Sequence, residues 1–155
     1  MHHVESTITI KGDPDEIFLM AQQVEDFPAY MTDVQSVTVV ERSGDRTVSD
    51  WVTAVDGTPF LWREEAHYDH DRRKISYKLI EGDLDTFEGE WTFTPVEEGT
   101  DVVLTVHFDF GLPNMEELIG PTLELKVREN SEMMLKALKG HFEGGDSWIS
   151  HERGE

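Results

Sequence analysis

Residues 114–142 read NMEELIGPTLELKVRENSEMMLKALKGHF and form the longest helical pattern in the chain. Apolar side chains recur there at three- and four-residue spacings, which places them on one stripe of a helix. A helix of this length extends about 40 Å, so we expect it to pack against an equally long apolar surface. One amide, Asn130, lies within the stripe. The stripe consists of Met115, Ile119, Leu123, Val127, Met133, Met134, Ala137 and Leu138, and the opposite face carries Glu117, Arg128, Glu132, Lys136 and Lys139.

The residues before this helix predict the surface that it packs against. Residues 4–10 alternate in polarity, as in a strand with one solvated face. Asp13 and Pro14 suit the N-cap and first position of a helix, and a short second helix or turn follows at 27–31. Short alternating segments with turns between them then predict an antiparallel meander, in which Asp56-Gly57 is the strongest hairpin signal. The predicted strands of the meander are 37–42, 48–55, 60–68, 75–80, 86–94 and 102–110.

These elements predict an α+β fold of the helix-grip type. A curved antiparallel sheet of about seven strands would wrap around the long C-terminal helix, with two short helices after the first strand. The sequence shows no repeat, no low-complexity segment and no linker, so we expect residues 1–155 to form a single domain. We also expect a ligand cavity between the sheet and the long helix.

The composition limits the partners of this chain. It has 33 acidic and 13 basic residues, a formal net charge of −20, and such a surface repels phosphate groups, so we expect no nucleic-acid partner. No apolar run is long enough for a membrane span or a signal peptide, and we expect no membrane insertion. The chain contains no cysteine, which rules out disulfides and thiolate catalysis and suits the cytoplasmic location that we expect. The sequence indicates no oligomeric state.

Strand alternation predicts which side chains face the long helix. Residues 60, 62, 66 and 68 would point inward, and that register makes Glu64 the only charge on its face, with Arg63 outside. The register of 48–55 is ambiguous, so Trp51 is a weaker candidate. The inward aromatic side chains would form walls for a flat ligand or simply a packed core. They are Trp62, Tyr77, Phe87, Trp91 and Phe108.

Asn130 and Glu64 are the polar groups that we expect on the inner surface. Asn130 would either satisfy its hydrogen bonds within the protein or orient a ligand, because an unpaired buried amide costs roughly 1–3 kcal/mol. A carboxyl group in an apolar interior pairs with a cation or has a raised pKa, and Glu64 would then suit acid–base chemistry. The alternatives are a register shifted by one residue, or a position near the solvated end of the cavity.

The histidine-containing segments do not predict a metal site. Two histidines and two aspartates gather at an expected hairpin turn, where such residues are ordinarily solvated, and no second His or Cys cluster accompanies them. We therefore expect no metal and no cofactor. The residues concerned are His67, Asp69, His70 and Asp71 at the turn and His2 and His3 near the N-terminus.

Five short motifs, in their order and spacing, carry a family resemblance. They are Asp26-Phe27-Pro28, Glu81-Gly82-Asp83, Trp91-Thr92-Phe93, Gly99-Thr100 and Glu129-Asn130. Over essentially its whole length the chain resembles the START-related, birch-pollen-allergen-like helix-grip superfamily, and in particular its polyketide cyclase/dehydratase and coenzyme Q-binding-like members. The resemblance implies a hydrophobic molecule held between sheet and helix, which some members cyclise or dehydrate. It also aligns Asn130 with a cavity asparagine.

Two positions depart from the pattern of the aromatic polyketide cyclases. Those proteins carry a cavity arginine on the middle strand and a tyrosine after the second short helix, where this chain has Ala66 and Val34. Only Tyr30, four residues before Val34, could replace that tyrosine. The resemblance therefore implies ligand binding more directly than catalysis.

We predict a protein that binds a small polyketide-, quinone- or lipid-like molecule. The alternative is a cyclase or dehydratase that uses Glu64 and Tyr77 as proton carriers. The predicted ligand-binding residues are Trp62, Glu64, Tyr77, Phe87, Trp91, Phe108, Val127, Asn130 and Met134.

Overall fold

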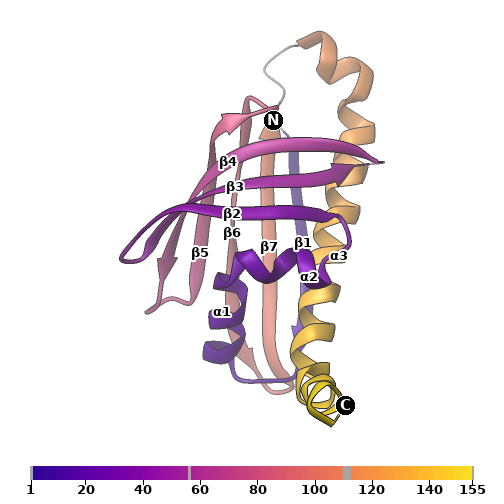
Figure 1. Cartoon of the computed structure of the whole chain (residues 1–155). Helices are drawn as coiled ribbons and strands as arrows, with labels where there is room; N and C mark the ends of the chain where they lie inside the picture. The colour runs from indigo at the N-terminus through magenta and orange to yellow at the C-terminus, as the bar shows by residue number, and fades with distance from the viewer. Residues whose placement is uncertain (1, 56, 110–112, 155) are drawn as a thin grey trace.

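The computed structural model describes residues 2–55, 57–109 and 113–154, and the side chains of 2–54, 57–109 and 121–144. One seven-stranded antiparallel sheet has the order β1-β7-β6-β5-β4-β3-β2 (Figure 1). The predicted α+β helix-grip fold is thus confirmed. The strands are β1 (His2–Ile10), β2 (Val34–Ser43), β3 (Arg46–Val55), β4 (Thr58–Asp69), β5 (Lys74–Gly82), β6 (Thr86–Val96) and β7 (Gly99–Asp109).

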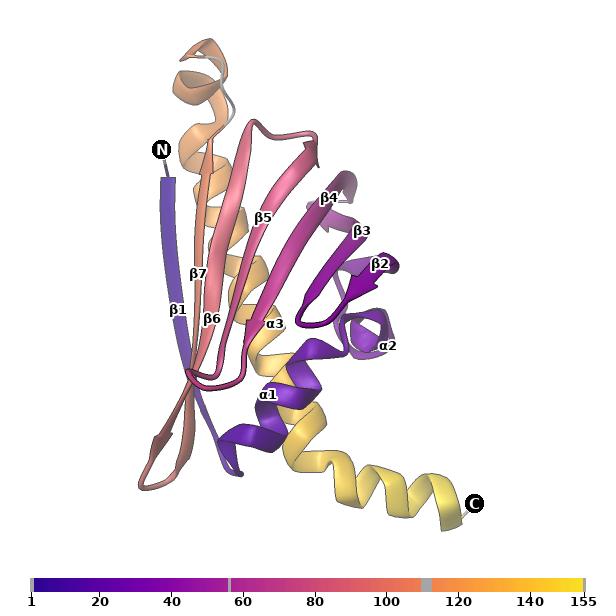
Figure 2. The same ribbon diagram turned by 90° about the vertical axis from the view of Figure 1, so that its left-hand side faces the viewer.

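The helices lie where the sequence predicted them. After β1 come α1 (Pro14–Gln22), a 3₁₀ turn η1 (Val24–Asp26) and α2 (Phe27–Tyr30). The Asp13 carboxylate accepts a hydrogen bond from Asp15 N at 2.7 Å, as expected of an N-cap. Figure 1 shows α1 and α2 at one end of the sheet, and Figure 2 shows the long helix along its concave side.

The long helix α3 (Pro113–Gly154) contains the predicted 114–142 segment and continues beyond it. It is held along β1 at two places, because His2 Nδ1 lies 2.8 Å from Glu124 Oε1 and Lys139 Nζ donates to Thr9 O at 2.6 Å. The expected apolar stripe is confirmed over the part of α3 whose side chains are described. Met115 and Ile119 of the stripe, and Glu117 of the opposite face, lie outside those residues. The buried members are Leu123, Met134 and Leu138, joined by Ser131 and Leu135, which the stripe had not included.

The six strands of the meander occupy their predicted places, with ends that differ by a few residues. Two of the predicted strand and turn residues, Asp56 and Phe110, lie outside the described part of the chain. Inward alternation is confirmed on β6 and β7, where Trp91, Phe93 and Leu104 are buried. No helix among the described residues has both the length and the apolar character needed to cross a membrane.

Candidate ligand-binding site

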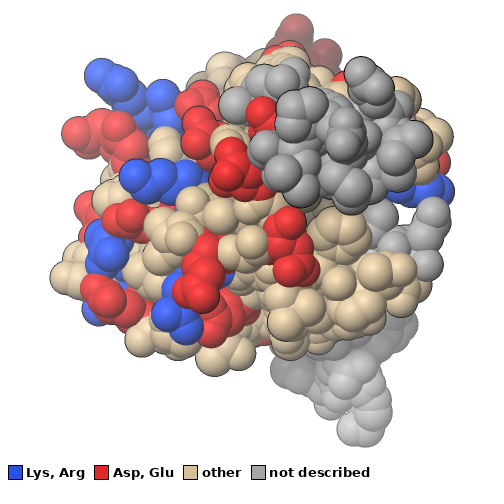
Figure 3. All heavy atoms as spheres, turned by 90° about the horizontal axis from the view of Figure 1, so that it is seen from above, with Lys and Arg blue, Asp and Glu red and all other residues tan. Residues whose placement is uncertain are grey.

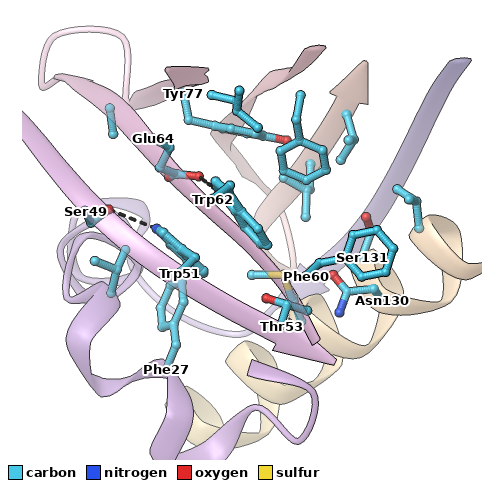
Figure 4. A pocket seen from close by; sticks show the side chains of 18 of the residues that line it. Phe27, Ser49, Trp51, Thr53, Phe60, Trp62, Glu64, Tyr77, Asn130 and Ser131 are labelled. Atoms are coloured by element: carbon cyan, nitrogen blue, oxygen red, sulfur yellow. Dashed lines mark hydrogen bonds between the residues drawn. The ribbon is translucent and has the colours of Figure 1, made fainter. Parts of the chain in front are cut away.

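A mostly apolar cavity lies between the concave face of the sheet and α3 (Figure 4). Its volume is about 90 Å³, whereas the whole gap between the lining atoms, including the part open to solvent, is about 1100 Å³. Aromatic side chains make up much of the wall, and polar groups are few. The aromatic residues are Phe27, Trp51, Phe60, Trp62, Phe87 and Trp91; the polar ones include Thr47, Ser49, Thr53, Glu64, Tyr68, Tyr77, Asn130 and Ser131.

Two stacked tryptophans, Trp51 on β3 and Trp62 on β4, form the centre of the aromatic wall. They are opposite each other in the strand register, and their ring centroids are 5.6 Å apart with planes 12° from parallel. Trp51 Nε1 donates to Ser49 Oγ at 2.9 Å, and Trp62 Nε1 donates to Glu64 Oε1 at 2.9 Å. Ser49 and Glu64 are themselves opposite each other. The sheet therefore presents a flat aromatic surface with a hydroxyl and a carboxyl group at its edge.

Glu64 is buried in this wall, with 7 % of its surface exposed. Burial raises the pKa of its carboxyl group to about 7, and the hydrogen bond from Trp62 opposes part of that rise. No lysine, arginine or histidine among the described residues forms an ion pair with it. The predicted inward direction is confirmed, and the alternative of a shifted register is wrong. Near neutral pH this carboxyl group exists in both protonation states.

Tyr77 also lines the cavity, but its hydroxyl group is bonded to the sheet. Tyr77 Oη donates to Thr105 O at 2.7 Å, and burial raises its pKa well above the ordinary value. Gly89 lies opposite Tyr77 on β6, and a Cβ atom there would stand 2.8 Å from the Tyr77 hydroxyl oxygen. The absence of a side chain at Gly89 therefore leaves room for the Tyr77 hydroxyl group to reach the Thr105 carbonyl group on β7.

The wall on the helix side is formed by Val127, Asn130, Ser131 and Met134. Asn130 faces the cavity as predicted (Figure 4), but its Nδ2 atom is buried and has no hydrogen-bond partner among the described residues. Of the two alternatives for Asn130, an internal hydrogen bond from Nδ2 is therefore not found among the described residues. A hydrogen-bond acceptor in the cavity would remove the cost of the unpaired donor, roughly 1–3 kcal/mol.

The open end of the cavity lies between β4, the β5–β6 turn and α3. Leu61 N donates to Asp83 Oδ2 at 2.9 Å and Asp83 N donates to Leu61 O at 3.1 Å, which fastens the turn to β4. Leu61, 52 % exposed, lines this end together with Leu84 and Lys126. Figure 3 shows acidic and basic side chains interspersed among neutral ones on this end of the molecule. The rim of this end therefore combines the apolar Leu61 and Leu84 with the charged Asp83 and Lys126.

Eight of the nine predicted ligand-binding residues line the cavity. Phe108 does not: it is fully buried and stacks on His2, with ring centroids 4.9 Å apart. The residues that line it are Trp62, Glu64, Tyr77, Phe87, Trp91, Val127, Asn130 and Met134.

Trp51 and Ser49 are the principal lining residues that strand alternation did not assign. The hairpin signal at 56–57 contained the missing information, because a two-residue turn there pairs Val55 with Thr58. Counting back along both strands from that pair places Trp51 opposite Trp62 and Ser49 opposite Glu64.

The two departures from the cyclase pattern hold in the structure. Ala66 lines the cavity, and Val34 is buried at the start of β2. Arg63 points to the outer face, where Nε lies 2.6 Å from Asp50 Oδ1. Tyr30 stacks on His141, with ring centroids 4.0 Å apart. Among the described residues that line the cavity there is no arginine, and those residues contain no group of three or more possible metal ligands.

The fold and the cavity together define a helix-grip protein, the architecture that the sequence predicted. Residues 10–135 match the family described as "Polyketide cyclase / dehydrase and lipid transport", and the chain belongs to that family.

Three known proteins illustrate the relationship. The crystal structure of TTHA0849 from Thermus thermophilus is similar, with a TM-score of 0.85 and 33 % identity, over 89 % of this chain and 94 % of that one. The Zhui aromatase/cyclase from Streptomyces sp. R1128 shares the fold, with a TM-score of 0.84 and 22 % identity, over 92 % of this chain and 94 % of that one. The actinorhodin polyketide synthase bifunctional cyclase/dehydratase of Streptomyces coelicolor is 26 % identical over an alignment of 125 residues, and the match covers 76 % of this chain but only 39 % of that protein.

Proposed function

We propose that this protein binds a small, flat, hydrophobic molecule of the polyketide, quinone or lipid type in the cavity. The observation that supports this most is the pair of stacked tryptophans beside Phe87, which turns a flat aromatic surface toward the gap under α3. Ligand sites are commonly apolar with a few placed polar groups, and Glu64 and Asn130 have that arrangement here. Affinity would come mainly from apolar area removed from water, at about 25 cal/mol per Å² before ordering costs.

The size of the cavity limits how such a ligand would fit. Sites for drug-sized ligands are roughly 300–1,000 Å³, whereas the cavity here is about 90 Å³. A ligand with several rings would therefore displace side chains toward the open end, where the gap between lining atoms is wider. Met134 is a flexible side chain suited to such repacking, and Phe60 and Leu84 are only partly buried.

Val127→Trp tests the position of the ligand. Val127 faces the cavity, so an indole there would occupy the space of the ligand and lower the affinity for 2-acetylnaphthalene, a neutral two-ring ketone, by at least about tenfold. The measurement is isothermal titration calorimetry at pH 6. Leu125→Trp is the matched control, because this residue on the same helix is 52 % exposed and does not line the cavity. Equal affinity in the two variants, with both folded by circular dichroism, would place binding elsewhere.

The second candidate function is that of a polyketide cyclase or dehydratase. It is favoured by a buried carboxyl group with a pKa of about 7 in the cavity and by the family relationship. In a dehydration, the Glu64 carboxylate would take a proton from the carbon beside a ketone, and the carboxylic acid would return that proton to the departing hydroxyl group, which leaves as water. The Tyr77 hydroxyl is bonded to Thr105 O, so we propose no proton transfer for it.

Two conservative variants test this second function. With a β-hydroxyketone substrate, Glu64→Gln is expected to reduce turnover by at least about a hundredfold while retaining binding, since general acid–base groups contribute about 10²–10⁴ in rate. Tyr77→Phe is expected to retain turnover. The measurement is the appearance of the conjugated enone by its absorbance. Absence of turnover in the wild-type protein, or full activity of Glu64→Gln, would leave the binding function alone.

A further inference from the structure

We infer that Glu64 selects neutral ligands that carry a hydrogen-bond acceptor, and that a bound ligand holds this carboxyl group in its protonated form. The inference rests on the proposed function, because it concerns a ligand in the same cavity. It assigns the ligand a chemical class, that of ketones and quinones rather than carboxylates.

The hydrogen bonds around Glu64 leave one of its oxygens available. Oε1 accepts the Trp62 indole N–H at 2.9 Å, and no other hydrogen bond to the carboxyl group is present among the described side chains. Ser49, opposite Glu64, already accepts the Trp51 indole N–H. A protonated Glu64 therefore has an O–H group to donate at the edge of the tryptophan pair, where an acceptor on a flat ligand would lie.

Among the described residues, no cation forms an ion pair with Glu64. Tyr68 on β4 and Tyr77 on β5 are uncharged at neutral pH, and their hydroxyl groups are bonded to Thr47 Oγ1 and Thr105 O. From α3, the polar residues Lys126, Asn130 and Ser131 line the cavity, and the charged one, Lys126, donates to Glu129 Oε1 at 3.4 Å. The charged groups nearby are Asp83 and Lys126 at the open end, and the Arg63–Asp50 and Arg46–Glu65 pairs on the outer face.

A ligand in the cavity makes ionisation of Glu64 more costly. Glu64 keeps 7 % of its surface exposed, so some solvent can reach its carboxylate in the ligand-free protein. An apolar ligand in the cavity would remove that contact, and the charged form would lose stabilisation without gaining a cation. Ionisation and ligand binding therefore oppose each other. A ligand carboxylate meets the same obstacle, since its own charge would be buried without a partner.

Asn130 indicates a second acceptor on the ligand. Its unpaired Nδ2 donor lies on the helix side of the cavity, and Figure 4 shows it across the cavity from Glu64. A quinone or diketone presents acceptors at both ends of a flat ring system, which matches two donors on opposite walls.

The test compares two probes of the same shape. 2-Acetylnaphthalene is neutral, whereas 2-naphthoate is anionic between pH 6 and pH 9. Because the pKa of Glu64 is about 7 in the empty protein, the dissociation constant of the ketone is expected to rise about tenfold per pH unit above pH 7. Calorimetry in two buffers of different ionisation enthalpy is expected to show uptake of nearly one proton on binding at pH 8–9 and little at pH 6. At pH 6 the carboxylate is expected to bind at least about tenfold more weakly.

Two variants complete the design. Glu64→Gln keeps a donor at this position and cannot ionise, so its affinity for the ketone is expected to be independent of pH and close to that of the wild-type protein at pH 6. Glu88→Gln removes an exposed carboxylate that does not line the cavity, and it is expected to keep the wild-type pH dependence.

Constant affinity of the wild-type protein between pH 6 and pH 9, without proton uptake, would overturn the inference and leave the proposed function standing. A pH dependence that persists in Glu64→Gln would also overturn it. Failure of the ketone to bind the wild-type protein at pH 6 would overturn the proposed function itself.

Discussion

Glu64→Gln is expected to raise the free energy of unfolding at pH 9 by about 3 kcal/mol and to leave it nearly unchanged at pH 4. The folded protein buries the Glu64 carboxyl group, which forms no ion pair with any described residue, and this burial raises its pKa from 4.5 to about 7. Glutamine has nearly the same shape and keeps an oxygen for the Trp62 indole N–H, but it never carries the charge.

The sign follows from proton binding in the two states. Between the unfolded pKa of 4.5 and the folded pKa of about 7, the folded protein binds more protons at Glu64 than the unfolded chain. Its stability therefore falls as the pH rises through this window and levels off above it. Below pH 4.5 the group is protonated in both states and makes no difference. The advantage of glutamine thus develops between pH 4.5 and about pH 8.

Urea unfolding of both proteins from pH 4 to pH 9 measures this difference. Glu65→Gln is the control with the opposite expectation. The Glu65 carboxylate accepts a hydrogen bond from Arg46 and contacts His67, and these contacts lower its pKa. Removing the carboxylate is therefore expected to destabilise the protein at neutral pH. Above about pH 8 both variants remove one negative charge from a chain of net charge −20, so general charge repulsion affects them alike there. A constant difference between wild type and Glu64→Gln at every pH would show that the carboxyl group is solvated.

Gly89→Ala is expected to lower the free energy of unfolding by about 3 kcal/mol and the Tm by about 10 °C. A Cβ atom at this position would overlap the Thr105 carbonyl oxygen and stand 2.8 Å from the Tyr77 hydroxyl oxygen. The sheet would have to open between β6 and β7, and the Tyr77–Thr105 hydrogen bond would be lost. Thermal unfolding followed by circular dichroism measures the effect.

Gly140→Ala is the matched control for the same chemical change. Gly140 lies in α3 with nothing within 4 Å of an added Cβ atom, and alanine is the better helix former, so stability is expected to rise by about 0.5–1 kcal/mol. In Gly89→Ala, affinity for 2-acetylnaphthalene is also expected to fall, because the displaced Tyr77 ring lines the cavity. If Gly89→Ala unfolds at the wild-type temperature, the Tyr77–Thr105 hydrogen bond does not require a glycine at position 89.

Much of the fold could be predicted because the signals are local. The three- and four-residue apolar spacing of 114–142 identified α3, and the alternation along 60–68 directed Glu64 to the inside and Arg63 to the outside. Asp13 and Pro14 marked the start of α1. Each of these patterns depends on the repeat of one helix or strand, which the order of residues determines directly.

The cavity residues were only partly predictable, because alternation assigns a face and not a depth. Phe108 and Trp91 both point inward, yet Phe108 stacks on His2 of the adjacent strand β1, which contacts Glu124 of α3, whereas Trp91 lines the cavity. Trp51 was uncertain until β3 was paired with β4, since its place depends on a partner strand.

The amino-acid sequence by itself determined which faces are apolar, where helices and strands begin, and that one carboxyl group and one amide turn toward the interior. Only the tertiary structure decided that Glu64 forms no ion pair with the described residues and that the Tyr77 hydroxyl group donates to a carbonyl group on β7. It also decided which aromatic rings line the cavity. The reason is physical: periodicity is a property of one segment, whereas solvation, pairing and free volume depend on the distances between segments that the curvature of the sheet brings together.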